Sequence, residues 1–289
     1  MGGRRGVMGG RRGVMGGEAG SEGRGGAPLT CWVVIPARNE AATVASTVRA
    51  ALAVPGVVGA LVVDDASRDG TGAAAAAAGA AVVRLPRRRG KGGALEAGVS
   101  RLPPCGAVMF LDADLGATAR AAGALLEAVR SGADMAVGVL ARPARRGGVG
   151  AVRRLARWGV SRLGGRPLQG ALSGQRCMTR AAAELLRPFA AGWGAEVGMG
   201  IAALRRGLVV REVHVAMAHR ATGRSLAGAW HRGGQLLGVA RALVGIALCD
   251  ARARGADAAP GTTSAEAAPA AASGAKGCTE PRSRIFWRR

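Results

Sequence analysis

Residues 108–115 read V-M-F-L-D-A-D-L, an apolar run that ends in two aspartates one residue apart. The run predicts a short buried strand. Two neighbouring carboxylates repel each other unless a positive charge lies close by. Mg²⁺ and Mn²⁺ prefer oxygen ligands, and Mg²⁺ commonly bridges one or two carboxylates to substrate phosphates. Asp112 and Asp114 therefore indicate a divalent metal site at a strand end, with two solvated turn aspartates as the alternative.

Apolar strand patterns alternate with helical patterns along most of the chain. We expect strands over 31–35, 59–63, 80–85, 106–111, 134–139 and 209–217. We expect helices over 41–52, 70–78, 118–130, 151–163, 180–187, 195–206 and 226–249, and one more that follows Gly90-Lys91-Gly92-Gly93 and ends near Val99. This alternation predicts an α/β fold with a mostly parallel sheet that helices cover on both faces.

Polar side chains follow three of the predicted strands. Arg38-Asn39-Glu40 follows the first strand, Asp64-Asp65 follows the second, and the two aspartates of the D-A-D stretch follow the fourth. In parallel sheets, ligands bind beyond the carboxyl ends of the strands. The three groups should therefore meet at one edge of the sheet and form a ligand site there.

The charge and composition favour an anionic partner. The formal net charge is +23, yet aromatic residues make up only 3% of the chain and Tyr is absent. A basic surface attracts nucleotides, phosphate esters, acidic lipids and nucleic acid. Stacking platforms for nucleic acid usually need aromatic residues among the basic ones, so we expect nucleic-acid binding at most as an accessory property of an Arg/Gly-rich tail.

The cysteines and the ends of the chain add little chemistry. Five scattered cysteines without a C-x-x-C spacing argue against a disulfide framework and a zinc site, and fit a reducing cytosol. Residues 1–27 contain the tandem M-G-G-R-R-G-V, and residues 251–289 are rich in Ala, Gly, Ser and Pro. We expect both ends to be disordered because neither can bury a core.

Four ordered stretches resemble family 2 glycosyltransferases. They are V-V-I-P-A-R-N-E (33–40), L-V-V-D-D-A-S-R-D-G-T (61–71), G-K-G-G-A-L (90–95) and F-L-D-A-D-L (110–115). The resemblance covers roughly residues 30–245. It implies the GT-A fold, with a nucleotide-sugar-binding half at 28–140 and an acceptor-binding half with a C-terminal helix at 141–250.

The same resemblance implies a role for each matching residue. Pro36, Arg38 and Glu40 would line the nucleoside pocket, while Asp65 would reach the base or ribose. Lys91 would approach the diphosphate, where a lysine acts as a point charge. Asp112 would contact the ribose or the metal, and Asp114 would ligate the metal and so take part in catalysis.

Three stretches of the second half resemble two subgroups of the family. P-L-Q-G-A-L-S-G-Q-R (167–176), G-W-G-A-E-V-G (192–198) and A-H-R-A-T-G-R-S (218–225) are similar to glucosyl-3-phosphoglycerate synthases and to dolichyl- or polyprenyl-phosphate sugar synthases. The resemblance implies that Glu196 is the general base or orients the acceptor, and that His219 completes the metal shell. Arg176 and Arg220 would grip an acceptor or leaving-group phosphate. For His219, a polar residue at a strand end is the alternative.

We therefore expect a glycosyltransferase that uses Mg²⁺ or Mn²⁺ and a nucleotide-diphosphate sugar, with UDP as the favoured nucleotide. The acceptor would be an anionic small molecule or a lipid phosphate, and the location cytoplasmic. Peripheral contact with the inner face of a membrane and a homodimer both stay open. So does the stereochemistry, because no Asp lies between Asp134 and Asp250 to act as an aspartate base. A nucleotidyltransferase is a weaker alternative, since P-A-R-N-E stands where its Gly-rich basic loop would be.

Overall fold

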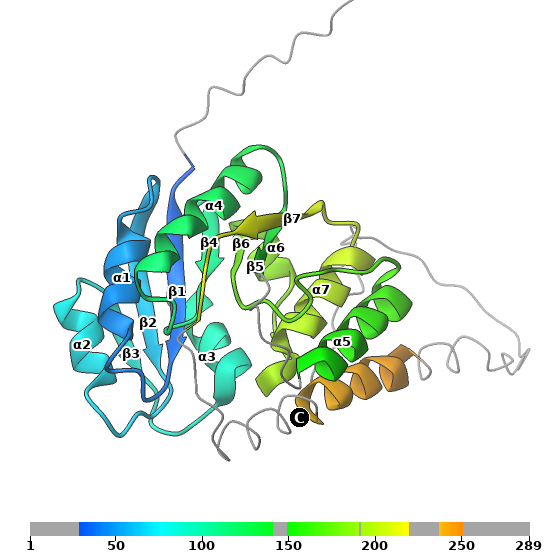
Figure 1. Ribbon diagram of the computed structural model, residues 1–289, viewed down its shortest axis with the longest axis horizontal. Helices are drawn as coiled ribbons and strands as arrows, with labels where there is room; N and C mark the ends of the chain where they lie inside the picture. Colours follow the sequence, from blue (N-terminus) through cyan, green and yellow to red (C-terminus); the bar gives the residue numbers. More distant parts are fainter. Residues whose placement is uncertain (1–28, 141–148, 191, 220–236, 251–289) are drawn as a thin grey trace, which may run out of the picture.

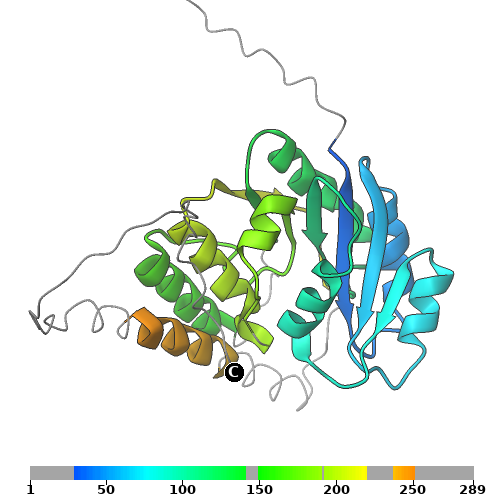
Figure 2. The same ribbon diagram turned by 180° about the vertical axis from the view of Figure 1, so that it is seen from behind.

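A single sheet of seven strands organises the chain, with helices on both of its faces (Figures 1 and 2). In the computed structural model, the described residues are 29–140, 149–190, 192–219 and 237–250. The strands are β1 Cys31–Ala37, β2 Val57–Asp64, β3 Ala81–Arg84, β4 Ala107–Phe110, β5 Met135–Leu140, β6 Arg176–Thr179 and β7 Val210–Val215. Their order in the sheet is β3-β2-β1-β4-β6-β5-β7.

The helices alternate with these strands. They are α1 Val44–Leu52, α2 Thr71–Ala77, α3 Gly90–Val99, α4 Gly123–Arg130, α5 Val149–Gly164, α6 Arg180–Leu185 and α7 Ala195–Arg205, with 3₁₀ turns η1 Gly116–Ala122 and η2 Gly192–Gly194. A further helix occupies residues 237–250. It lies beside α5 in both views, and a side chain added at Gly159 of α5 would collide with Leu243 of this helix.

The sheet is mostly parallel, which confirms the predicted fold class. Strands β3, β2, β1 and β4 pair in parallel, as do β5 and β7. Strand β6 runs antiparallel to both of its neighbours, β4 and β5. Because parallel strands end at the same edge, the residues after β1, β2 and β4 meet there. Strand β6 enters the sheet from that edge, since it runs the other way.

Two apolar layers hold the sheet. One contains buried residues of α1, η1 and α4, such as Val48 and Leu125, packed on one face of the strands. The other contains buried residues of α3, α5, α7 and the helix at 237–250, such as Leu95, Ile201 and Val239. The strands buried between these layers read as near-continuous apolar runs, which is why their type could be predicted from the sequence.

Several element limits differ from the sequence prediction. The run at 31–35 continues through Pro36 to Ala37. Proline is tolerated there because β4 ends at Phe110, opposite Val34, so the end of β1 has a ladder partner on the β2 side only. The helix expected over 118–130 is divided into η1 and α4. The predicted terminal tails and Arg220 lie outside the described residues.

Candidate active site

Two carboxylates and an imidazole meet just beyond the ends of β4 and β7. Asp114 Oδ1 lies 2.9 Å from His219 Nδ1, and Asp112 Oδ2 lies 3.8 Å from His219 Nε2. One ligand atom from each of the three residues can be chosen so that all lie within 4.8 Å of one another. The sheet order explains this meeting, because β4 and β7 run in the same direction and both end at this edge of the sheet.

The donor set fits a hard or borderline divalent cation. Two carboxylates and one imidazole nitrogen are ligands that Mn²⁺ accepts, and Mg²⁺ favours the carboxylates. All three side chains retain contact with solvent, at 21% exposed for Asp112, 26% for Asp114 and 42% for His219. Free coordination positions could therefore be filled by water or by phosphate oxygens. The residues present thus fit the metal site that the sequence predicted.

Lys91 joins Asp112 to the second half of the chain. Its Nζ lies 2.5 Å from Asp112 Oδ1 and 2.6 Å from Glu196 Oε1. Burial by itself would lower the pKa of Lys91, but the charges of Asp112 and Glu196 outweigh it and raise the pKa. Burial would likewise raise the pKa of Asp112, yet Lys91 and then His219 hold it below its usual value. The lysine and Asp112 are therefore both charged at neutral pH.

Glu196 sits in the first turn of α7 and is 4% exposed. An unpaired carboxylate is costly to bury, so the contact with Lys91 accounts for its presence in an otherwise apolar helix. The sequence placed Lys91 at the diphosphate and Glu196 at the acceptor. The structure brings these two side chains into direct contact, so the predicted donor and acceptor sides adjoin.

Asp65 holds the start of the helix that carries Lys91. Its two carboxylate oxygens accept the backbone N–H groups of Arg89, at 2.6 Å, and Gly90, at 2.8 Å. The first N–H groups of a helix have no partner within the helix, and a negative charge there is favourable. Asp65 therefore fixes α3 and, through it, the position of Lys91. Its contact with a base or ribose stays a prediction.

Two threonines fix the loops that bear the metal-site residues. The buried Thr47 hydroxyl donates to the Ala113 carbonyl at 2.9 Å and accepts the Gly116 N–H at 2.8 Å. The Thr118 hydroxyl accepts the N–H of Ala218, the residue before His219, at 3.2 Å. The D-A-D loop and the segment after β7 are thus held from α1 and from η1.

The loops after β1 and β2 are joined by hydrogen bonds on the proposed nucleoside side. Asn39 donates its N–H to Ser67 Oγ and accepts the N–H of Arg68 with its side-chain oxygen. The Glu40 N–H is bonded to Thr71 Oγ1 at 2.8 Å, and the Glu40 carboxylate accepts from Thr43 at 2.9 Å. Beside them, Pro36 is half-buried and Arg38 is exposed. Their predicted contacts with a nucleoside stay predictions.

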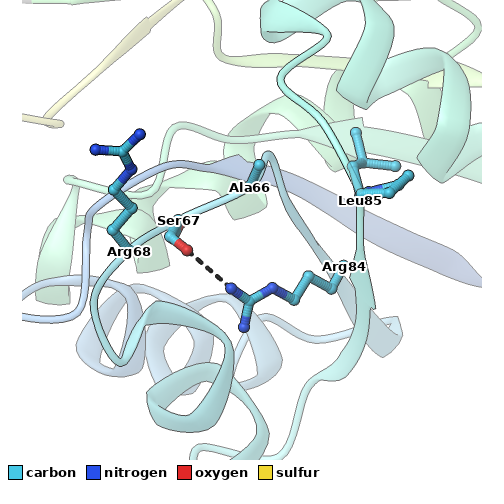
Figure 3. Close-up of a pocket in the computed structure, with 6 residues that line it drawn as sticks. Ala66, Ser67, Arg68, Arg84 and Leu85 are labelled. Carbon is cyan, nitrogen blue, oxygen red and sulfur yellow. Dashed lines mark hydrogen bonds between the residues drawn. The ribbon is translucent and has the colours of Figure 1, made fainter.

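A recess of about 400 Å³ opens beyond the ends of β2 and β3 (Figure 3). Within it, Arg84 donates to the Ser67 carbonyl at 2.9 Å. The recess is lined by Ala66, Ser67, Arg68, Arg84, Leu85 and Pro86. None of these residues is Asp112, Asp114 or His219. The recess therefore lies next to Asp65, at the ends of β2 and β3, and shares no lining residue with the candidate metal site.

Arg176 occupies a different place from the one its predicted role suggests. It is 1% exposed at the start of β6, and it donates to the carbonyls of Ser173 at 3.0 Å and Ala171 at 3.3 Å. Burial lowers the pKa of its guanidinium to about 10, against the opposing charges of Glu196 and Glu212. Its Nη1 is buried without a hydrogen-bond partner. In this structure Arg176 braces the preceding loop, and its predicted contact with a phosphate stays a prediction.

Gln175 has no role that the sequence predicts. This residue is fully buried, and its amide contacts Asp112 and His219. Its place next to Arg176 in the S-G-Q-R stretch was visible, but nothing local indicates that an amide at this position reaches the D-A-D loop. That contact depends on the pairing of β6 with β4, which the sequence did not reveal.

Comparison with known proteins agrees with the family resemblance. Residues 32–174 match the family model described as glycosyl transferase family 2. Residues 32–174 therefore form a family 2 glycosyltransferase domain. The matched range contains Lys91, Asp112 and Asp114, while Glu196 and His219 lie beyond it. Among curated proteins, no sequence matches this glycosyltransferase.

Solved structures extend the similarity beyond the matched range. Glucosyl-3-phosphoglycerate synthase from Mycobacterium tuberculosis in complex with phosphoglyceric acid has a TM-score of 0.63 and 29% identity, over 75% of this chain and 80% of that one. Its complex with Mn²⁺, UDP-glucose and phosphoglyceric acid gives the same TM-score and identity, over 75% and 79%. A structure described as a mycobacterial protein has a TM-score of 0.64 and 29% identity, over 75% and 74%. The glycosyltransferase shares their GT-A fold, as predicted.

Proposed function

We propose that the chain transfers a sugar from a nucleotide-diphosphate sugar to a phosphorylated acceptor, with Mg²⁺ or Mn²⁺ held by Asp112, Asp114 and His219. The observation that carries this proposal is the group of two carboxylates and one imidazole within 4.8 Å, placed where the strands of a family 2 domain end. The similar synthase from M. tuberculosis was solved with Mn²⁺ and UDP-glucose, and also with Mg²⁺ and UDP.

When bound, the cation would neutralise the negative charge that develops on a departing diphosphate. Lys91 lies beside the same carboxylate and supplies a second positive charge in a partly buried place, where electrostatic interactions are stronger than in water. Asp112 has both of its oxygens occupied, by Lys91 and by Gln175, so its orientation toward the diphosphate is set before a donor arrives.

Glu196 is our candidate for the acceptor side of the reaction. Its carboxylate contacts Lys91 and its side chain is 6% exposed, so the carboxylate adjoins the predicted donor side and is shielded from bulk water. In an inverting reaction it would accept the acceptor's hydroxyl proton, and in a retaining reaction it would orient the acceptor. Glu196→Gln keeps the size of the side chain, so it should lower turnover more than donor affinity.

We propose UDP-glucose as the donor and phosphoglyceric acid as the acceptor to be tested first. The support is the similar synthase that was solved with both molecules. The formal charge of +23 agrees with two anionic substrates. Arg220 stays our candidate for the acceptor phosphate, although it lies outside the described residues.

The test is an assay of products with Mn²⁺, a panel of nucleotide sugars, and phosphoglyceric acid. Release of a nucleoside diphosphate that depends on both the cation and the acceptor would support the proposal. Release of pyrophosphate would instead indicate a nucleotidyltransferase. Glu127→Gln is a matched control for carboxylate variants because Glu127 belongs to an exposed ion pair on α4.

A lipid-phosphate acceptor is a second candidate, favoured by one surface feature. Trp158 on α5 is 62% exposed, and Leu237, Val244 and Leu248 on the last described helix are 55–65% exposed. No described helix has the length and apolar character needed to cross a bilayer. Sedimentation with vesicles of anionic lipid tests peripheral binding, and sedimentation velocity without lipid tests whether a second copy of the chain covers the same residues.

A further inference from the structure

We propose that Gln175 is a positioning residue for the metal site, one that fixes the carboxylate of Asp112 and the ring of His219 in the orientation that a divalent cation needs. The proposal deepens the metal-dependent function proposed above and rests on it. It concerns a side chain that contacts both expected ligands and that has no role predicted from the sequence.

The Gln175 side-chain amide makes two hydrogen bonds to Asp112, one through its oxygen and one through its nitrogen. Its Oε1 accepts the backbone N–H of Asp112 at 3.0 Å, and its Nε2 donates to Asp112 Oδ2 at 2.7 Å. A carboxylate side chain has no donor, and an ammonium or guanidinium group has no acceptor, so neither could make both contacts. The side chain is 0% exposed, so water cannot replace these bonds. With Lys91 on Oδ1, Asp112 is fixed on both of its oxygens.

The same amide nitrogen faces the imidazole. Gln175 Nε2 lies 3.5 Å from His219 Nε2. Since the amide oxygen is held by the Asp112 backbone, the NH₂ end has to face the ring. That end already donates to Asp112 Oδ2, and it makes a second favourable contact when His219 Nε2 presents a lone pair and the ring proton sits on Nδ1, which lies 2.9 Å from Asp114 Oδ1. A cation bound at Nε2 would take this lone pair in place of the Gln175 contact, so the amide sets the ring tautomer before a cation binds.

The residues around Gln175 hold it in this place. A Cβ at Gly174 would lie 2.7 Å from both carboxylate oxygens of Asp112, so only glycine lets this backbone approach so closely. On the other side, Arg176 binds the carbonyls of Ser173 and Ala171. The Gln175 carbonyl accepts the N–H of Gly138 on β5 at 2.8 Å. The backbone that carries the Gln175 side chain is thus anchored to the sheet.

The first test compares Gln175→Met with Gln169→Met, the same change at an exposed position of the preceding loop. The dissociation constant of Mn²⁺ is measured on the full chain by electron paramagnetic resonance in the presence of UDP. Loss of a residue that orients metal ligands typically weakens metal binding about 10- to 100-fold. We expect a weakening of this size for Gln175→Met and none for Gln169→Met. Equal affinity in Gln175→Met and the wild type would overturn the proposal.

The second test needs no variant of Gln175. Nitrogen chemical shifts of the His219 ring are measured in the wild-type chain with chelator, at a pH where the ring is neutral. The signal among the three histidines is identified by its loss in His219→Gln. We expect the proton on Nδ1, and a proton on Nε2 would overturn the proposal. A wild-type chain that binds no Mn²⁺ would overturn the proposed function and this proposal together, whereas either result above overturns this proposal alone.

Discussion

Replacing Lys91 with Met removes the one cation that bridges Asp112 and Glu196 among the described contacts. Removing one partner of a buried ion pair typically costs about 3–5 kcal/mol of unfolding free energy, since a charge stays behind unpaired. The side chains of Lys91 and Asp112 are 18% and 21% exposed, so water offsets part of this cost. We therefore expect a loss near the lower end, about 3 kcal/mol. For a domain of this size that corresponds to a Tm lower by about 6–12 °C.

A second substitution, at Glu196, tests the origin of this loss of stability. Its carboxylate is 6% exposed and would be left without its cation in Lys91→Met. Glu196→Gln should therefore stabilise the Lys91→Met chain while leaving the wild type unchanged or less stable. Denaturant unfolding of the two single variants and the double variant measures this coupling. A loss below about 1 kcal/mol for Lys91→Met, the size expected of a surface pair, would refute the reasoning. So would an equal effect of Glu196→Gln in both backgrounds.

Three further predictions follow from the metal-site loops. Asp114→Ala should abolish transfer but leave the Tm nearly unchanged, because the Asp114 carboxylate contacts the solvent-accessible His219; wild-type turnover would contradict the metal assignment. The hydrogen bond to Asp114 raises the pKa of His219, and a protonated ring cannot ligate, so Mn²⁺ affinity should fall as the pH drops through a point above about 6.5. His219→Gln should flatten that titration, and an unchanged pH profile would assign it to another group. Thr47→Val leaves the Ala113 carbonyl and the Gly116 N–H without their buried partner. It should therefore lower the free energy of unfolding, measured with denaturant, by about 1–3 kcal/mol and weaken Mn²⁺ binding. A loss of stability with unchanged Mn²⁺ affinity would contradict the role of Thr47 in holding the D-A-D loop.

The sequence was sufficient to predict the sheet edge and its acids. The strands that precede Asp64 and Asp112 are apolar runs buried on both faces, and such runs are recognisable without a structure. Since parallel strands end at one edge, the meeting of their polar ends could be predicted from their type alone. His219 could be placed only through the family resemblance, because the segment after β7 carries no local sign of a ligand.

The contacts that organise the site could not be predicted. Strand β6 has four residues and begins with Arg176, so it shows neither an apolar run nor a clear alternation. Without that strand, nothing placed Gln175 against Asp112. The contact between Lys91 and Glu196 joins two helices far apart in the sequence, and it depends on how α3 and η2 pack. The sequence shows the charge of Arg176, which suggests a phosphate as its partner, but it does not show that this side chain is buried.

The proposed function depends most on a cation held by Asp112, Asp114 and His219 together with a nucleotide diphosphate. Isothermal titration of UDP into the full chain, with Mn²⁺ in excess and again with chelator, tests this directly. We predict that UDP binds with Mn²⁺, and that the heat of binding disappears with chelator and in Asp114→Ala. UDP that binds equally well with chelator, or that fails to bind with Mn²⁺ in excess, would contradict the account.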